Sequence, residues 1–161
     1  MTQFLASIGF GQWILHVLLV LPLVGLVPLF LAPAAAAKRV ALVVTVVELV
    51  LSIGLWWAVD TTPGTLQLTS SLPWIEAWGI HYSVGIDGIS LTMVLLTTLL
   101  MPLCVLASWN SITDRERSYF AMLLTLLTGV IGVFVATDLF LFYVFWEVML
   151  IPMYFIIGIW G

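Results

Sequence analysis

The sequence predicts an all-α protein that crosses a membrane several times. Hydrophobic residues make up 63% of the 161 residues and charged residues only 7%, whereas soluble domains are about 45–50% apolar and about 25% charged. A surface with so few charges is poorly solvated by water, so lipid is expected to surround most of the chain. The 8 Trp and 4 Tyr residues fit anchoring at the two membrane interfaces.

Five apolar runs are long enough to cross a bilayer, whose hydrocarbon core needs about 20 residues of helix. They are expected at Trp13–Leu31, Val40–Val59, Ile89–Trp109, Tyr119–Ala136 and Leu139–Trp160. The first run has an alternative interpretation as a secretory signal peptide, because the small residues of the stretch 32–36 follow it. It is longer than a signal core, and no basic residue precedes Lys38, which favours a membrane helix.

The four basic residues predict the orientation, because Lys and Arg concentrate in cytoplasmic loops. Lys38 and Arg39 follow the first run, and Arg115 and Arg117 follow the third. Segment 60–88, after the second run, contains acidic residues and no Lys or Arg. We therefore expect both basic loops in the cytoplasm and the N-terminus and segment 60–88 outside.

Segment 60–88 is predicted to form a short strand or hairpin on the outer membrane surface. Apolar residues alternate with polar or small ones from Ile80 to Ile86, which is the period of a strand. The pair Pro63-Gly64 is a turn signal.

Two aspartates are placed to cap helices. Asp87 directly precedes the third apolar run, and Asp138 lies between the fourth and the fifth. Each carboxylate is expected to accept hydrogen bonds from the first turn of the helix that follows. His16 and His81 are expected to have structural partners near the outer interface, although either could titrate near neutral pH. Cys104 lies in an apolar run and is expected to be a buried, inert thiol.

Prolines inside the first, third and fifth runs indicate that the helices pack as a bundle. Each removes one backbone hydrogen bond, and lipid cannot replace it. Thr97 and Thr98 are expected local partners for the carbonyl group that Pro102 frees. The prolines concerned are Pro22, Pro28, Pro102 and Pro152.

The fourth run carries a face of small residues along its whole length. They fall within roughly one quarter of the helix circumference at about 3.6 residues per turn. Such a face lets two helix backbones approach closely. The fifth run is the expected partner, because almost no loop separates it from the fourth. The small residues are Ala121, Thr125, Gly129, Gly132 and Ala136.

Glu147 is the leading candidate for chemistry. It lies about 12 Å along the fifth run from its outer end, near the middle of the hydrocarbon. A charge at that depth costs on the order of 2.5–3.5 kcal/mol, so such residues typically mark ion or proton pathways. Tyr143 and Tyr154 share its helix face, and Pro152 frees the neighbouring carbonyl of Val148. The alternative is an acid kept neutral by burial that hydrogen-bonds a neighbouring helix.

Glu48 is a second candidate and also lies near the middle of its run, so the same cost applies to it. No Tyr, Pro or His shares its helix face. A protonated packing contact is therefore favoured, and a role in proton transfer is the alternative.

Composition excludes several other functions. The net charge is -4 and the few basic residues form no cluster, so no nucleic-acid partner is expected. One cysteine cannot form a disulfide or hold an iron–sulfur cluster within the chain. The sequence also lacks a nicotinamide or flavin fingerprint, so no cofactor is expected in this chain.

The last part of the chain resembles a known family. The stretch 129–161, and above all Trp146-Glu147-Val-Met-Leu-Ile-Pro-Met-Tyr154, is similar to the M subunit (chain 4) of the NADH:quinone oxidoreductase, respiratory complex I. The opening Gly85-Ile-Asp-Gly-Ile-Ser90 of the third run resembles the same subunit. The resemblance is strong from about Val84 onward, and the first two runs share only the hydropathy of the family.

The resemblance implies the N-terminal part of an antiporter-like, fourteen-helix subunit with its N-terminus outside and two inverted five-helix repeats. Residues 1–118 would hold the first three helices with the outer loop 60–88, and residues 119–161 would begin the first repeat. Glu147 would take part in proton translocation, paired with a lysine on a later helix that is absent here. Tyr143, Tyr154 and Glu48 are further candidates for that path on the physical argument alone, since Glu48 matches nothing in the family motif.

The function implied is that of a membrane-arm subunit of a proton-pumping NADH:quinone oxidoreductase. A buried carboxylate would couple NADH oxidation and quinone reduction to proton movement. NADH, flavin, iron–sulfur clusters and quinone are expected in partner subunits, and the other membrane-arm subunits and the lipid bilayer are the expected partners. The location would be the cell inner (plasma) membrane, or the inner mitochondrial membrane if the protein is organellar.

Two alternatives stay open at this point. A subunit of a sodium/proton antiporter or of an energy-converting hydrogenase would share the fold and the glutamate, and only the residues around Glu147 argue against it. A complete protein of 161 residues would instead be a structural membrane component.

Overall fold

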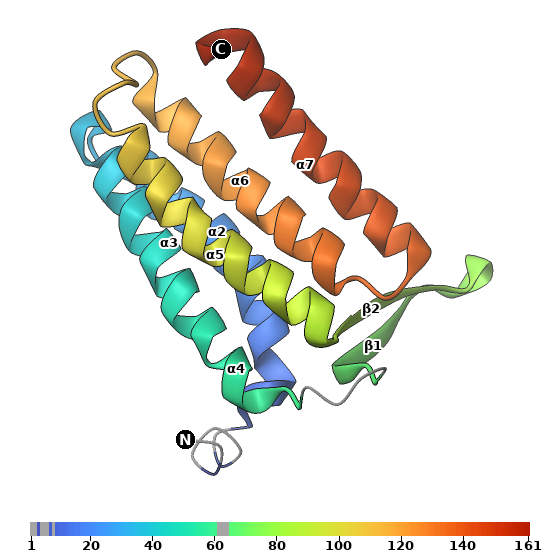
Figure 1. Ribbon diagram of the computed structural model, residues 1–161. Coiled ribbons are helices and arrows are strands. Elements are labelled where there is room, and N and C mark those ends of the chain that lie inside the picture. The colour runs from blue at the N-terminus through green and yellow to red at the C-terminus, as the bar shows by residue number, and fades with distance from the viewer. Residues whose placement is uncertain (1–2, 4–6, 8, 61–64) are drawn as a thin grey trace.

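A computed structural model describes residues 3, 7, 9–60 and 65–161, and Figure 1 shows that helices dominate it. Five helices within these residues are long and apolar enough to cross a membrane, as predicted. They are α2 (Phe10–Leu31), α3 (Ala37–Ile53), α5 (Gly88–Ala107), α6 (Glu116–Val135) and α7 (Leu139–Trp160). The short helices η1 (Ala34–Ala36) and α4 (Leu55–Ala58) extend α3 at its two ends.

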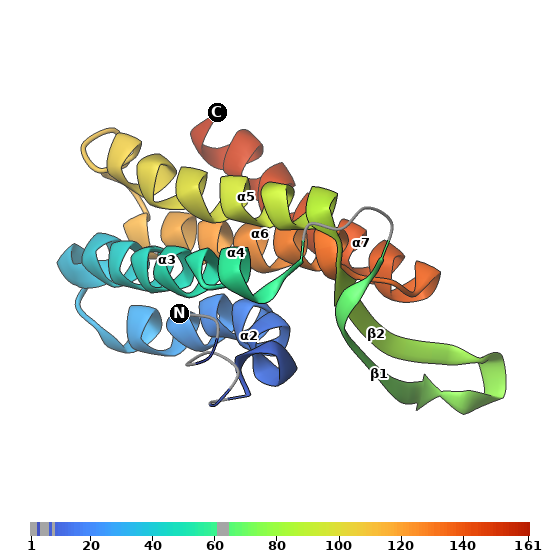
Figure 2. The same cartoon turned by 60° about the horizontal axis from the view of Figure 1, so that its bottom comes forward.

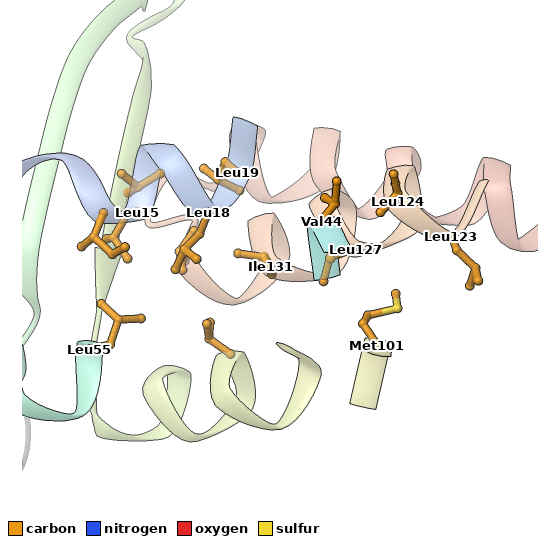
Figure 3. Packing of buried hydrophobic residues seen from close by; sticks show 14 of the residues in the cluster. Leu15, Leu18, Leu19, Val44, Leu55, Met101, Leu123, Leu124, Leu127 and Ile131 are labelled. Carbon is orange, nitrogen blue, oxygen red and sulfur yellow. The ribbon is translucent and has the colours of Figure 1, made fainter. Parts of the chain in front are cut away.

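Helices α2, α3, α5 and α6 form a bundle, and α7 packs on the outer side of α6 (Figures 1 and 2). The core between the four helices is made of aliphatic side chains. In Figure 3, Leu15 and Leu18 of α2 lie close to Leu55 of α4 and Ile131 of α6. Farther along the bundle, Leu127 of α6 lies near Met101 of α5. The interior of the bundle is therefore the part of the chain that lies farthest from lipid.

A two-stranded antiparallel sheet lies across one end of the bundle (Figure 2). Strand β1 (Gln67–Ile75) pairs with β2 (Ile80–Ile86), and η2 (Glu76–Trp78) lies between them. Strand β2 covers the stretch that alternates in the sequence, so a strand was correctly predicted there, although Val84, Gly85 and Ile86 are all buried. The predicted turn at Pro63-Gly64 lies outside the described residues.

Both predicted aspartate caps are confirmed. Asp87 Oδ1 accepts a hydrogen bond from the backbone N–H of Ser90 at 2.7 Å, at the start of α5. Asp138 Oδ1 accepts from the N–H groups of Phe140 and Leu141 at 2.9 and 3.1 Å, at the start of α7. Each cap satisfies donors that a helix N-terminus otherwise leaves unpaired.

The two basic loops lie at the same end of the bundle, opposite the sheet (Figure 1). Lys38 Nζ lies 4.0 Å from a carboxylate oxygen of Glu116, and the guanidinium of Arg117 donates to the carbonyl of Ala32 at 2.7 Å. These contacts join the loop after α2 to the start of α6. As expected from the basic residues, the two basic loops lie at one end of the bundle and the segment that contains the sheet lies at the other.

The small face of α6 packs on α7. A Cβ atom added at Gly129 would lie 2.9 Å from the backbone of Met149, and one added at Gly132 would overlap the ring of Phe145. The prediction that Gly132 lies against another helix is confirmed, and the partner is α7 as expected. Only hydrogen atoms at these two positions allow the backbones to come so close.

Two local predictions were wrong. Cys104 is exposed on the outer face of α5, beside the exposed Leu103. A thiol is apolar enough to face lipid, so an apolar run does not require it to be buried. The hydroxyl groups of Thr97 and Thr98 donate to the carbonyls of Met93 and Leu95, which are the acceptors that a helical threonine reaches most easily. Neither hydroxyl serves the carbonyl that Pro102 frees.

We predict that Gly129→Ala separates α6 from α7 and destabilises the protein by about 1–3 kcal/mol, the usual effect of overpacking. The methyl group would meet the backbone of Met149, which cannot rotate away. Thermal unfolding in detergent measures the effect. Gly158→Ala on α7 is the matched control, because a Cβ atom there meets nothing within 4 Å. Equal stability of the two variants would contradict the packing described.

Candidate functional site

Glu147 lies on the side of α7 that points away from α6. Phe145 and Met149 face the glycines of α6, and Glu147 is two residues from each of them, which places it roughly on the opposite side at about 100° per residue. Its side chain is exposed in this chain. Glu147 is therefore available to groups outside the described bundle.

Tyr143 is the residue that the structure brings to Glu147. Its hydroxyl interacts electrostatically with the Glu147 carboxyl group, which lies one helical turn away. Tyr154 occupies the same face but lies two turns farther along α7, where its ring contacts Phe155 at 5.5 Å between centroids. The predicted tyrosine stripe is thus present as a face of the helix, and only Tyr143 belongs to the immediate surroundings of the glutamate.

The face of α7 that carries Glu147 is suited to contact with other helices. A shallow apolar groove on it is lined by Leu150, Met153, Tyr154, Ile157 and Gly158. In an apolar stretch of 18 residues, only 11% of α7 is buried in this chain, against 61% of α6. A carboxyl group near mid-membrane is unfavourable in lipid, so this face requires polar neighbours that the bundle itself does not supply.

Glu48 is in the opposite situation. Its side chain is completely buried in the four-helix bundle, and within the described part of the chain neither carboxyl oxygen has a hydrogen-bond partner. The burial that a packing contact at Glu48 requires is thus present, whereas burial of Glu147 remains a prediction.

The surroundings of Glu48 are more polar than the sequence analysis expected. Thr45 and Ser52 lie three residues before and four after it, on the same face of α3, and both are buried. The hydroxyl of Ser52 lies 2.7 Å from that of Thr98 on α5. The sequence shows that Thr45 and Ser52 share a helix face with Glu48, because they are three residues before it and four after it. It does not show that Thr98, on another helix, lies beside Ser52.

The two histidines join helices to the sheet. His16 Nδ1 on α2 lies 2.9 Å from the hydroxyl of Tyr82, and the two rings stack. Burial raises the pKa of Tyr82 above its ordinary value, which favours the neutral phenol in this contact. The backbone N–H of His81 donates to Asp138 at 3.4 Å, and its ring contacts the carbonyl of Gly79. Both residues have the structural partners that were expected.

These features define a class of protein. It is a polytopic helical membrane protein with one carboxyl group in the bundle interior, at Glu48, and another on the open face of α7, at Glu147. Among residues 9–60 and 65–161, no three His, Cys, Asp or Glu side chains are grouped so as to hold a metal ion. Residues 15–133 match the sequence model of the family "NADH-ubiquinone oxidoreductase chain 4, amino terminus". The chain belongs to this family.

Individual relatives agree with the family match. Chain 4 of the NADH-ubiquinone oxidoreductase of Mycosarcoma maydis is 41% identical over 155 residues, which cover 91% of this chain and 31% of that protein. Subunit M of the NADH-quinone oxidoreductase of Escherichia coli K12 is 44% identical over 130 residues, covering 77% and 26%. The match from residue 15 onward includes the first two helices, which the sequence analysis had related to the family only by hydropathy.

A solved structure supports the same conclusion for the fold. A chain of respiratory complex I from Thermus thermophilus with bound NADH superposes with a TM-score of 0.75 at 25% identity, covering 91% of this chain and 29% of that one. The chain thus spans about a quarter to a third of the length of these relatives.

The cap at Asp138 makes the start of α7 sensitive to acid. Hydrogen bonds from backbone N–H groups, that of Leu141 foremost, lower the pKa of Asp138 below its ordinary value of 3.8. The stabilisation by the cap is therefore present above pH 3.8 and is lost as the pH falls through the lower pKa of the folded state.

We predict that Asp138→Ala lowers the thermal stability at neutral pH and that Asp138→Asn, which keeps an acceptor, lowers it less. In both variants the loss of stability between neutral pH and pH 3 should be smaller than in the unchanged protein. Melting curves over that pH range measure this. An unchanged acid dependence in both variants would show that Asp138 does not stabilise the helix as a carboxylate.

Proposed function

We propose that this chain forms part of a proton-translocating membrane subunit of an NADH:quinone oxidoreductase, and that Glu147 binds the proton that moves. Family membership supports the complex. The observation that carries the site is the position of Glu147 beside Tyr143, on the face of α7 directed away from α6. Eight residues into α7, Glu147 would lie near mid-membrane. The match to the chain 4 family favours this function over an antiporter or a hydrogenase subunit.

The open face of α7 supplies the physical reason. A carboxyl group at this depth needs polar partners. The relatives are three to four times as long as this chain, and further helices in such a protein would provide these partners. A cation on such a helix would form an ion pair with Glu147. Opening and closing the pair would change the proton affinity of the carboxyl group, so that Glu147 takes up a proton in one state and releases it in the other. Tyr143 would orient the carboxyl group by its hydrogen bond.

The remaining roles are assigned to other parts of the complex. NADH, flavin, iron–sulfur clusters and quinone would be bound by partner subunits, and the neighbours of this chain would be other membrane-arm subunits. Residues 1–118 would serve as an N-terminal helical support, and residues 119–161 would begin the antiporter-like repeat. The complex would lie in the inner membrane of a bacterium or of a mitochondrion.

We predict that Glu147→Gln leaves the complex assembled but reduces proton pumping by roughly tenfold or more, since an amide fills the same space and cannot exchange a proton. Glu147→Asp should retain more activity, because it keeps an acid. Proton pumping and quinone reduction are measured in membrane vesicles that contain equal amounts of assembled complex.

Tyr143→Phe provides a graded comparison for this experiment. It removes the hydroxyl near Glu147 but no acid, so it should reduce pumping less than Glu147→Gln does. Normal pumping by the Glu147→Gln variant would overturn the assignment. Loss of assembly in that variant would instead indicate a structural role, because a packing acid contributes mainly its hydrogen bonds.

The proposal includes an orientation with the sheet outside and both basic loops in the cytoplasm. We predict that a cysteine introduced at Ser111 reacts only with reagents added from the cytoplasmic side, and one at Ala77 only with those added from outside. Both positions are exposed. Labelling in intact cells and inverted vesicles, with Cys104→Ser as background, measures the orientation. Outside labelling at position 111 would reverse it.

A further inference from the structure

Polar groups from several helices meet at one depth inside the four-helix bundle. Glu48 and Ser52 come from α3, Thr98 from α5 and Thr128 from α6, and all four side chains are buried. The Thr128 hydroxyl donates to the carbonyl of Leu19 on α2 at 3.3 Å. If α4 is counted as the end of the α3 span, at Ala58, the four residues lie about 9–15 Å along their helices from the sheet end, at about 1.5 Å per residue. These residues, called the polar layer below, lie within roughly one helical turn of depth in an otherwise aliphatic core, and the hydroxyls of Ser52 and Thr98 are in direct contact.

The hydroxyl protons of this layer are already used. Ser52 contacts the carbonyl of Leu49 at 2.8 Å, and Thr98 contacts that of Leu95 at 3.1 Å. The two hydroxyls also contact each other, so two protons must serve three contacts. Thr45 donates to the carbonyl of Ala41 at 3.0 Å. None of these groups has a proton left for Glu48.

Two prolines add further acceptors at the same depth. Pro22 and Pro102 have no N–H, so the carbonyls of Leu18 and Thr98 lose the donor that an unbroken helix would provide. Leu18 and Thr98 are completely buried, and lipid has no donor to offer. The layer that contains Glu48 therefore has more hydrogen-bond acceptors than donors.

No cation compensates for this excess in the part of the chain that the structure describes. On α3 the closest cation in sequence is Arg39, nine residues from Glu48 and thus about 13 Å along the axis. The titratable residue of α2 is His16, and that of α5 is Cys104. The titratable residues of α6 lie in its first turn, at the end far from the sheet: Glu116, Arg117 and Tyr119. His16 is in contact with Tyr82. An ionised Glu48 would thus be a buried charge without a partner, which is strongly unfavourable.

We propose that Glu48, together with Ser52 and Thr98, forms a hydrated proton-binding site in the interior of the four-helix bundle. Glu48 is protonated there, and its O–H supplies one of the missing donors. One or more water molecules supply the others, each bridging two to four of the acceptors described. The site is separate from Glu147, which lies beyond α6 on the far side of α7, and it does not depend on the function proposed for that residue.

Infrared difference spectroscopy tests the proposal on the complex that contains this chain, purified from its native membrane and reconstituted in lipid. The carbonyl stretch of a protonated carboxyl group should be present at neutral pH and should disappear in Glu48→Gln. In D2O the band should shift within minutes, because water reaches the site. Glu48→Asp should move the band without removing it, and Glu147→Gln should leave it in place.

Two further variants test the hydroxyl groups. Ser52→Ala should change the frequency of the Glu48 band, since it removes one hydroxyl of the pair, whereas Ser52→Thr should restore it. Thr92→Val is the control, because Thr92 is an exposed residue of α5 near its outer end. It should leave the band unchanged.

Three outcomes would overturn the proposal. If no carboxyl band is lost in Glu48→Gln, the residue is not protonated. If the band is present but does not exchange in D2O over hours, Glu48 is a dry structural acid. If added sodium ions remove the band, the layer binds a metal cation in place of a proton. If Glu48→Gln fails to assemble, Glu48→Asp replaces it in the experiment. The protonated aspartate should then show a carboxyl band at a new frequency that shifts in D2O, and absence of such a band would overturn the proposal.

Discussion

The close packing of α6 against its neighbours is the interaction on which the rest of this structure depends. One side of α6 contributes Leu124, Leu127 and Ile131 to the core shared with α2, α3 and α5. The other side presents Gly129 and Gly132 to α7. Without a strong hydrophobic driving force between helices in lipid, association relies on close contact of this kind. The position of α7, and therefore the direction in which Glu147 points, follows from it.

The two membrane carboxyl groups of the chain illustrate two ways of placing an acid in a bilayer. Glu48 is completely buried in the bundle, one helical turn from Ser52, whose hydroxyl contacts that of Thr98. Glu147 stands on an open helix face, where its environment is completed by whatever packs on α7. The first arrangement favours a held proton, since the site offers nothing to stabilise a charge. The second allows the environment to change when a neighbour moves, which is what a transport step needs.

The sheet end of the bundle is held together by polar contacts. Ser83 bonds Thr137 both through their hydroxyls and through the backbone, at 2.7 and 2.9 Å, and His16 bonds Tyr82. These contacts join β2 to the α6–α7 junction and to α2. They fix the start of α7 from outside the hydrocarbon, together with the Asp138 cap. The sheet thus helps to position α7, the helix that carries Glu147.

The sequence by itself determined the five membrane helices, the β2 alternation, the two caps and the glycine face of α6. Each of these depends on residues that are close together in the chain: a run of apolar side chains, a period of two, an aspartate before a helix, small residues three or four apart. The family was recognisable for a similar reason, because the residues around Glu147 form one continuous stretch.

Only the tertiary structure decided which carboxyl group is buried and which faces of the helices meet. In lipid, apolar side chains are favourable on both the inner and the outer face of a helix, so hydropathy does not distinguish the two. Cys104 was therefore expected inside and lies outside. The contact between Ser52 and Thr98 joins residues 46 positions apart, and no local pattern specifies it. The polar layer around Glu48 exists because four helices bring their hydroxyl and carbonyl groups to the same depth, and that depth is set by how the helices pack.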